Sequence, residues 1–157
     1  MSLATSVIIP AKNRVALLRK TIGSVLSQNI PTEIIIVDDG SQPPLSSQLK
    51  TFSGHVKIVR INKSKGSMAA RNSGFQYAKG DYIAFLDSDD IWNKDFLKVS
   101  LRYLQNDQST IATVCLSQKI YPKDWPPQRI FRLKDSDRLP VPKDLSERLA
   151  ATKNIPT

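Results

Sequence analysis

The sequence has few of the residues that build disulfide-rich or zinc-binding folds. It contains one cysteine and one histidine, which excludes an internal disulfide framework and a cysteine-rich zinc site. Cys115 lies in an apolar stretch, so we expect a buried, unreactive thiol rather than a nucleophile. His55 has no partners at metal-ligand spacing and is expected at the surface.

Long apolar runs are also missing. No stretch approaches the roughly 20 residues of a membrane-spanning helix, and residues 1–5 lack the basic start of a signal peptide. We therefore expect a cytoplasmic protein. Its net charge of +9 is spread along the chain, which leaves open phosphate-bearing substrates and peripheral contact with the inner, anionic face of a membrane. No RNA- or DNA-binding signature accompanies the charge, so we expect no nucleic acid partner.

Glycine-rich phosphate-binding loops are absent as well. The sequence has neither a Walker-type loop nor a Gly-x-Gly-x-x-Gly motif. The first predicted strand leads into Pro10-Ala11-Lys12-Asn13, which contains no glycine. ATP hydrolysis and dinucleotide binding therefore lose their main support.

The most informative stretch present is a short apolar run followed by acids. Residues 82–86 predict a buried strand, because the run is too short for a helix. Asp87, Asp89 and Asp90 follow, and three carboxylates so close together repel one another in any folded state. They remain ionised at low cost only in water or on a cation. This favours a site for Mg²⁺ or Mn²⁺; the alternative is a solvated loop before a helix.

Predicted strands and helices alternate along the first 117 residues. The predicted strands are 6–9, 33–37, 56–61, 82–86 and 111–116, and the predicted helices are 14–28, 45–52, 67–79 and 93–106. We expect Pro10 to stop the first strand and Asn13 and Asn93 to cap helices. The alternation predicts an α/β fold with a mainly parallel sheet and helices on both faces.

Polar segments follow the strands of this predicted sheet at residues 10–13, 38–41, 62–66 and 87–90. Ligands of such sheets bind beyond the carboxyl ends of the strands, so these segments should converge. Asp38 or Asp39 could accept hydrogen bonds from a base or ribose, although Asp-Gly-Ser is also a common turn. Lys65 and Arg71 could offset the charge of a diphosphate, or belong to a solvated basic loop.

The chain changes character after residue 117. Six of its ten prolines lie in residues 118–157, where the apolar pattern also breaks up. We therefore predict an α/β domain over residues 1–117 and an irregular, proline-rich, basic tail over residues 118–157.

Four motifs, in this order and spacing, resemble the family 2 glycosyltransferases. They are Val7-Ile8-Ile9-Pro10 with Asn13, Ile36-Val37-Asp38-Asp39-Gly40-Ser41, Gly66 with Ala70-Arg71-Asn72 and Gly74, and the stretch Gly80 to Asp90 with its Asp-Ser-Asp. The resemblance covers about residues 5–117 and corresponds to the donor-binding half of the Rossmann-like GT-A fold.

The resemblance implies a nucleotide-sugar donor, often a UDP-sugar, with Mn²⁺ or Mg²⁺ and inversion at the anomeric carbon. It implies nucleotide-sugar binding by Pro10, Ala11, Asn13, Asp38, Asp39, Gly66, Arg71, Asp87 and Ser88, and metal binding by Asp89 and Asp87. The cation would stabilise the diphosphate leaving group. A role in making cell-envelope polysaccharide is typical of the family.

The sequence departs from the family pattern at the catalytic base. No segment of residues 118–157 matches the one that carries it, and Asp135 and Asp137 are not assigned to this role. We expect the base beyond residue 157, together with the half that binds a saccharide, lipid-linked or protein acceptor. We also expect a partial fold to expose apolar surface and to self-associate.

Three other interpretations of the sequence compete with the glycosyltransferase resemblance. Phosphotransfer enzymes of the haloacid dehalogenase type and receiver domains carry their acidic motifs after the first strand. Here the acidic motifs follow the second and fourth predicted strands, which disfavours both classes. A non-catalytic module that binds polyanions through basic residues would need no metal and no nucleotide.

Overall fold

The computed structural model describes residues 5–106 and 112–113. The chain divides into two compact units, residues 1–102 and 103–157, and the sheet belongs to the first. Cys115, the predicted domain boundary after residue 117 and the predicted tail lie outside the described residues. So do all but two residues of the predicted strand at 111–116.

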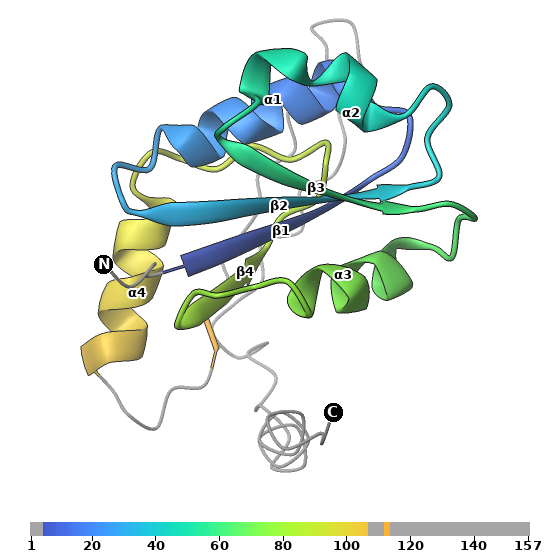
Figure 1. The fold of residues 1–157 in the computed structure, drawn as a ribbon. Helices are drawn as coiled ribbons and strands as arrows, with labels where there is room; N and C mark the ends of the chain where they lie inside the picture. The colour runs from blue at the N-terminus through green and yellow to red at the C-terminus, as the bar shows by residue number, and fades with distance from the viewer. Residues whose placement is uncertain (1–4, 107–111, 114–157) are drawn as a thin grey trace, which may run out of the picture. The chain divides into compact units, whose positions relative to one another are not determined.

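A parallel sheet of four strands forms the centre of the first unit (Figure 1). Its order is β3-β2-β1-β4, with β1 at Thr5–Ala11, β2 at Thr32–Asp39, β3 at Val56–Ile61 and β4 at Tyr82–Phe85. The inner strands β1 and β2 are almost wholly buried. Their near-continuous β-branched residues are typical of strands covered on both faces.

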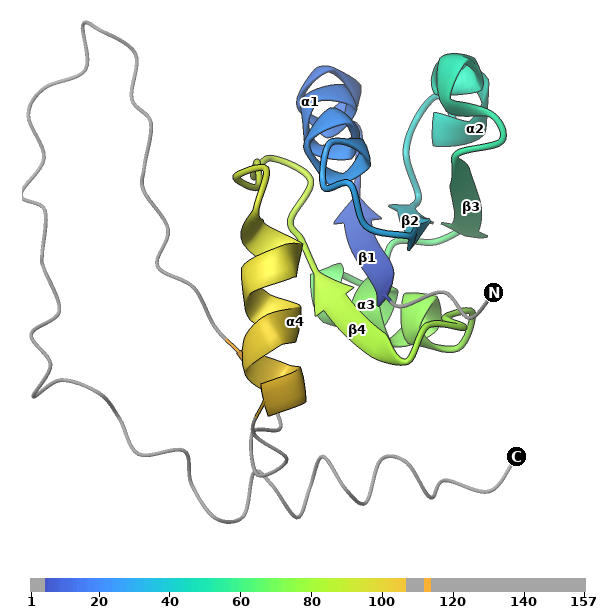
Figure 2. The same ribbon diagram turned by 90° about the vertical axis from the view of Figure 1, so that its left-hand side faces the viewer.

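Helices cover both faces of this sheet. They are α1 (Val15–Leu26), α2 (Leu45–Gln48) with the 3₁₀ turn η1 (Lys50–Phe52), α3 (Ser67–Phe75) and α4 (Phe96–Asn106). In Figures 1 and 2, α1 and α2 lie on one face and α3 on the other. Successive residues of β1 face opposite sides of the sheet: Val7 and Ile9 pack with Leu18 of α1, whereas Ile8 packs with Ala70 of α3. The predicted α/β architecture is confirmed.

Pro10 does not stop β1 as predicted, because the strand continues through Ala11. The carbonyl of Ile8 accepts a hydrogen bond from Leu86 N at 3.2 Å, on the side of β4. Pro10, two residues later, faces the same side, but pairing with β4 ends at Ile8. The N–H that proline lacks is therefore not needed for a ladder bond.

The two predicted asparagine caps are also wrong. Helix α1 begins at Val15 without a side-chain cap, and Asn13 adopts a positive φ of 60°. Helix α4 begins at Phe96, three residues after Asn93. The N–H of Leu97, in its first turn, donates instead to Oε1 of Gln28 at 3.0 Å, so the turn after α1 provides the cap.

Among residues 5–106 and 112–113, no helix combines the length and apolar character needed to cross a membrane.

Candidate functional site

A cavity of about 510 Å³ lies at the carboxyl ends of β1, β2 and β4. Eight of the predicted site residues line it: Pro10, Ala11, Asp39, Gly66, Arg71, Asp87, Ser88 and Asp89. Four further residues line it that the sequence did not single out, namely Lys12, Arg14, Ser64 and Ser67. The expected convergence of polar segments at this edge therefore occurs in the structure.

The wall nearest β2 is built around Asp39, the last residue of that strand. Its carboxylate accepts hydrogen bonds from Ser64 Oγ at 2.7 Å, Lys65 N at 2.8 Å and Gly66 N at 3.0 Å. Burial alone would raise the pKa of Asp39, but these bonds, with the charge of Lys12, lower it below the usual value. Asp39 thus stays ionised and fixes the loop before α3.

Gly66 ends that loop in a conformation that favours glycine, with φ of 87°. Its carbonyl accepts the N–H of Ala70, which starts α3. One turn into this helix is Arg71, whose Nη2 pairs with a carboxylate oxygen of Asp87. The loop held by Asp39 therefore also sets the position of Arg71 in the cavity.

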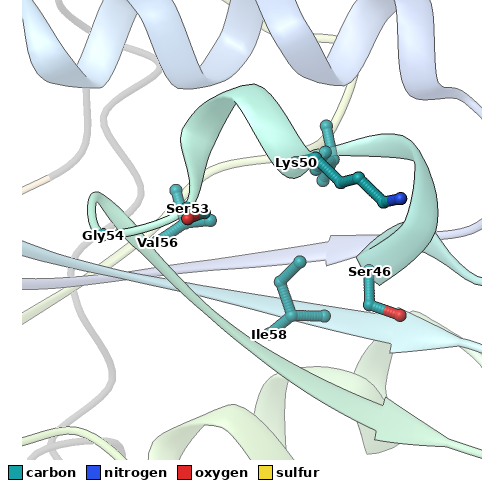
Figure 3. A pocket seen from close by; sticks show the side chains of 7 residues that line it. Ser46, Lys50, Ser53, Gly54, Val56 and Ile58 are labelled. Carbon is teal, nitrogen blue, oxygen red and sulfur yellow. The ribbon is translucent and has the colours of Figure 1, made fainter.

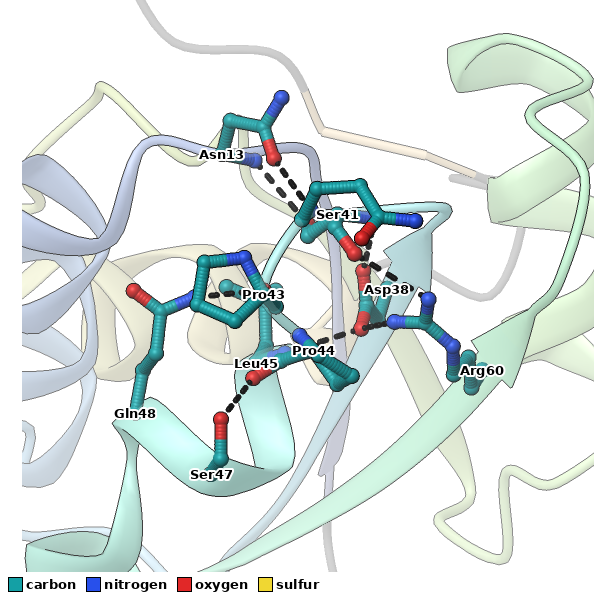
Figure 4. A network of polar contacts seen from close by, with 10 residues as sticks. Asn13, Asp38, Ser41, Pro43, Pro44, Leu45, Ser47, Gln48 and Arg60 are labelled. Atoms are coloured by element: carbon teal, nitrogen blue, oxygen red, sulfur yellow. Dashed lines mark hydrogen bonds and ion pairs between the residues drawn. The ribbon is translucent and has the colours of Figure 1, made fainter.

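Asp38 does not line the cavity, although it precedes Asp39. Its side chain is fully buried and accepts hydrogen bonds from Ser41 N at 2.8 Å and Leu45 N at 3.0 Å (Figure 4). Arg60 Nη1 pairs with the same carboxylate. Burial raises the pKa of Asp38, and the bonds from Ser41, Leu45 and Arg60 outweigh it and lower the pKa. In this structure Asp38 anchors the turn after β2.

Asn13 belongs to the same polar network and is likewise outside the cavity lining (Figure 4). Its N–H donates to Ser41 Oγ at 3.0 Å, and its Oδ1 accepts the N–H of Gln42 at 2.8 Å. Asn13 thereby ties the loop after β1 to the loop after β2. That loop after β1 carries Lys12 and Arg14 into the cavity wall.

The acidic residues form a tight turn after β4, closed by a hydrogen bond from Asp90 N to the carbonyl of Asp87 at 3.1 Å. Asp87 and Asp89 line the cavity and Asp90 does not. Arg14 Nη1 lies 2.6 Å from Asp89 Oδ2. Burial, followed by the charges of Asp89 and Asp87, raises the pKa of Asp90.

Asp87, Asp89 and Asp90 do not form a preformed metal-binding site. Within the described part of the chain, no cluster of three or more His, Cys, Asp or Glu side chains is arranged to hold a metal ion. Two exposed carboxylates, Asp87 and Asp89, nevertheless share one cavity, with 52% and 43% of their side-chain surfaces accessible. Hard oxygen ligands of this kind fit Mg²⁺ or Mn²⁺ if a ligand or water supplies the remaining positions.

A second cavity, of about 550 Å³, lies between α2, η1 and the edge strand β3 (Figure 3). Its lining contains Lys50 and otherwise serine, glycine and aliphatic residues such as Val56 and Ile58. It contains none of the predicted site residues and no carboxylate.

Comparison with known proteins decides the family. Residues 6–154 match the family described as Glycosyl transferase family 2. The chain belongs to this family. The resemblance inferred from the four sequence motifs is therefore confirmed.

Curated members of the family support this assignment. The chain is 38% identical over 103 residues to the putative teichuronic acid biosynthesis glycosyltransferase TuaG of Bacillus subtilis, covering 63% of this chain and 41% of TuaG. It is 36% identical over 105 residues to Escherichia coli WfgD, a UDP-Glc:alpha-D-GlcNAc-diphosphoundecaprenol beta-1,3-glucosyltransferase, covering 64% and 42%. The chain spans less than half the length of these relatives.

Solved structures agree with the GT-A fold. The S. aureus TarS fragment 1–349 in complex with UDP-GlcNAc has a TM-score of 0.61 and 26% identity, covering 66% of this chain and 31% of that one. The Pyrobaculum calidifontis mannosyltransferase PcManGT, in complex with GDP-Man and Mn²⁺, has a TM-score of 0.58 at 21% identity and covers 66% and 33%. At that identity the second likeness concerns the fold alone.

Proposed function

We propose that the chain is the donor-binding part of an inverting glycosyltransferase that uses a nucleoside-diphosphate sugar, most simply a UDP-sugar, with Mn²⁺ or Mg²⁺. One observation carries the proposal. A single cavity at the carboxyl ends of the strands contains both a carboxylate-fixed loop, at Asp39, and two carboxylates paired with arginines, at Asp87 and Asp89. The UDP-GlcNAc complex of TarS supports a uridine nucleotide as the first donor to test.

Each wall of the cavity suits one part of such a donor. Pro10 and Ala11 offer the apolar border for the nucleoside, and Asp39 lies beside it as an acceptor for the base edge. Arg14 and Arg71 can offer guanidinium groups to the diphosphate, since these groups match phosphate oxygens in pairs.

Asp89, with Asp87, would hold the divalent cation. When bound, the cation would stabilise the charge that develops on the departing diphosphate. Arg14 and Arg71 pair with these carboxylates. A donor that brings its own negative charge would allow the arginines to exchange a carboxylate partner for phosphate oxygens. The acidic pair would then be released to the cation.

Transfer also needs a group that takes the proton of the acceptor hydroxyl. We assign no residue of 5–106 to this role and place the base and the acceptor site in sequence beyond residue 157. WfgD is named for a diphosphoundecaprenol-linked acceptor and TuaG for teichuronic acid biosynthesis. These names support a lipid-linked or polymeric saccharide acceptor for a cell-envelope polysaccharide, handled at the inner face of the membrane.

Calorimetric titration with UDP, in the presence and absence of Mn²⁺, tests the proposal. We expect Mn²⁺ to strengthen UDP binding to the chain and Asp89→Ala to abolish the gain. The control is Asp95→Ala, which removes an exposed acid outside the cavity lining. Failure of UDP, GDP and dTDP to bind would refute the donor site, and equal binding with and without Mn²⁺ would refute the metal.

A further inference from the structure

Three buried polar side chains lie in or just after α1: Thr21 and Ser24 in the helix and Gln28 two residues beyond its end, with 0%, 8% and 2% of their surfaces accessible. Thr21 and Ser24 lie three residues apart and so share one side of the helix, and Gln28 Nε2 donates to the carbonyl of Ser24 at 3.0 Å. Burying polar groups is unfavourable unless each finds a hydrogen-bond partner. All three have partners in one segment, the acidic turn and the residues that connect it to α4.

Ser24 and Gln28 hold the later part of that segment. Ser24 Oγ accepts the N–H of Trp92 at 3.2 Å. Gln28 Nε2 donates to the carbonyl of Asn93 at 2.8 Å, and Gln28 Oε1 accepts the N–H of Leu97 at 3.0 Å. The polypeptide that follows the acids is therefore fixed at three points, one by Ser24 of α1 and two by Gln28 in the turn after it.

Thr21 holds the acidic turn itself. Its hydroxyl lies 2.8 Å from the carbonyl oxygen of Asp90 and 3.1 Å from that of Ser88. The carbonyl of Leu17, one turn earlier in α1, is a third acceptor at 3.3 Å, so the single hydroxyl hydrogen favours the nearer carbonyls of Asp90 and Ser88. These carbonyls belong to the residues immediately before and after Asp89. The contact thereby restrains the peptide units that define the direction of the Asp89 side chain.

Asp89 has a second contact, to the residue that precedes the same helix. Arg14, the residue before α1, pairs with the Asp89 carboxylate, whereas Thr21 bonds the flanking carbonyls. The start of the turn is fixed separately, by the bond from Leu86 N to the carbonyl of Ile8 in β1. The turn is thus held by β1 at its first residues and by α1 at its last.

We propose that Thr21 is a positioning residue for Asp89: its hydroxyl holds the acidic turn in the geometry needed to bind the divalent cation. The cation itself rests on the function proposed above. Residues that orient a metal ligand change metal affinity by about 10- to 100-fold when they are removed, without touching the metal. Thr21 would act in this way through the backbone.

Thr21→Val keeps the shape of the side chain and removes the hydroxyl, whereas Thr21→Ser retains the hydroxyl. The control is Thr51→Val, the same change at an exposed threonine of η1. Two quantities are measured on each full chain. The first is amide hydrogen exchange over residues 88–93 without ligand, and the second is UDP affinity by calorimetry with and without Mn²⁺.

We expect Thr21→Val to accelerate exchange over residues 88–93 and to weaken the Mn²⁺-dependent part of UDP binding by about 10-fold. Metal-free UDP affinity should be unchanged, and Thr21→Ser should restore both properties. Unchanged exchange in Thr21→Val, or an equal loss of affinity with and without Mn²⁺, would overturn the proposal.

The two hypotheses fail in different ways. If the unaltered chain binds UDP equally with and without Mn²⁺, the metal in the proposed function is refuted, and exchange alone decides whether Thr21 holds the turn. Faster exchange that Thr21→Ser reverses would then support the positioning role, and unchanged exchange would refute it.

Discussion

Arg14 and Asp89 are 75 positions apart in the sequence, yet Nη1 of the arginine lies 2.6 Å from Oδ2 of the acid. A similar pair joins Arg71 to Asp87. Both acids are those proposed to hold the cation, so without a donor each is neutralised by a guanidinium. The cation must compete with these arginines, while the diphosphate gains from them. Because the arginines oppose the cation and attract the diphosphate, the affinity for the metal is expected to depend on whether the nucleotide is bound.

Arg14→Gln is expected to tighten the binding of free Mn²⁺ by several-fold, because it removes both the competing partner of Asp89 and a nearby positive charge. The same change is expected to weaken the binding of Mn²⁺-UDP, because it removes a guanidinium from the cavity wall. Stability should change by less than about 1 kcal/mol, since partly exposed ion pairs contribute little. Electron paramagnetic resonance of free Mn²⁺ and calorimetry with UDP measure the two affinities.

Lys20→Gln is the matched control for this charge, because Lys20 is exposed on α1 and does not line the cavity. The competition is disproved if Arg14→Gln and Lys20→Gln have the same effect on free Mn²⁺. It is also disproved if Arg14→Gln weakens free Mn²⁺ binding.

The alternation of apolar runs with amphipathic segments was sufficient to predict the sheet and its helices. The rule that parallel strands present ligands at their carboxyl ends was sufficient to bring Asp39, Asp87 and Asp89 together in one place. Both predictions depend on periodicity and topology, which are properties of the whole pattern. They do not depend on the conformation of any single residue.

Single-residue predictions were less successful because the partners of those residues are distant in sequence. Asn13 was expected to cap α1, but its side chain bonds the loop after β2. Asp38 and Asp39 are adjacent aspartates. Only the alternation of side chains along β2 places Asp38 in the buried turn network and Asp39 in the cavity wall. Lys12 and Arg14 had a usable signal, since Lys12 lies in the polar segment 10–13 predicted at the sheet edge and Arg14 directly follows it. Thr21 and Gln28 had another, as polar residues on the apolar side of the predicted helix 14–28.

Asp38→Asn is expected to destabilise the fold by about 3 kcal/mol, because the substitution leaves the partly buried Arg60 without its counter-charge. The pKa of Asp38 is lowered by folding from its ordinary value of 3.8. Below that value the unfolded chain binds the proton more readily than the folded chain. The stabilisation by Asp38 is therefore complete above about pH 4.8, one unit above that value, and is lost as the pH falls through the folded-state pKa.

Urea denaturation of the chain and of Asp38→Asn, followed from pH 7 down to pH 3, tests this linkage. The difference in unfolding free energy should be largest at neutral pH and should shrink below pH 4. Asp95→Asn, at an exposed acid before α4, is the comparison. A difference that stays constant across this range would show that Asp38 stabilises the fold without its charge.

Gly74 and Gly23 form a pair of helical glycines with opposite surroundings. A Cβ at Gly74 in α3 would lie 2.5 Å from Ile8 Cγ2 and 2.9 Å from Val37 Cγ2, side chains of the central strands β1 and β2. A Cβ at Gly23 in α1 would have no atom within 4 Å. The glycine in α3 therefore allows that helix to approach the sheet closely, while the glycine in α1 has no such role.

Gly74→Ala is expected to lower the unfolding free energy by about 1–3 kcal/mol, because the added methyl group overpacks α3 against the sheet. Gly23→Ala is expected to raise it by about 0.5–1 kcal/mol, because alanine loses less backbone entropy on forming a helix. Urea denaturation of both variants measures the two changes under the same conditions. Because α3 carries Arg71 towards Asp87, a shift of the helix in Gly74→Ala should also weaken UDP binding, whereas Gly23→Ala should leave it unchanged. Equal effects of the two substitutions on stability would show that α3 does not need its close contact with Ile8 and Val37.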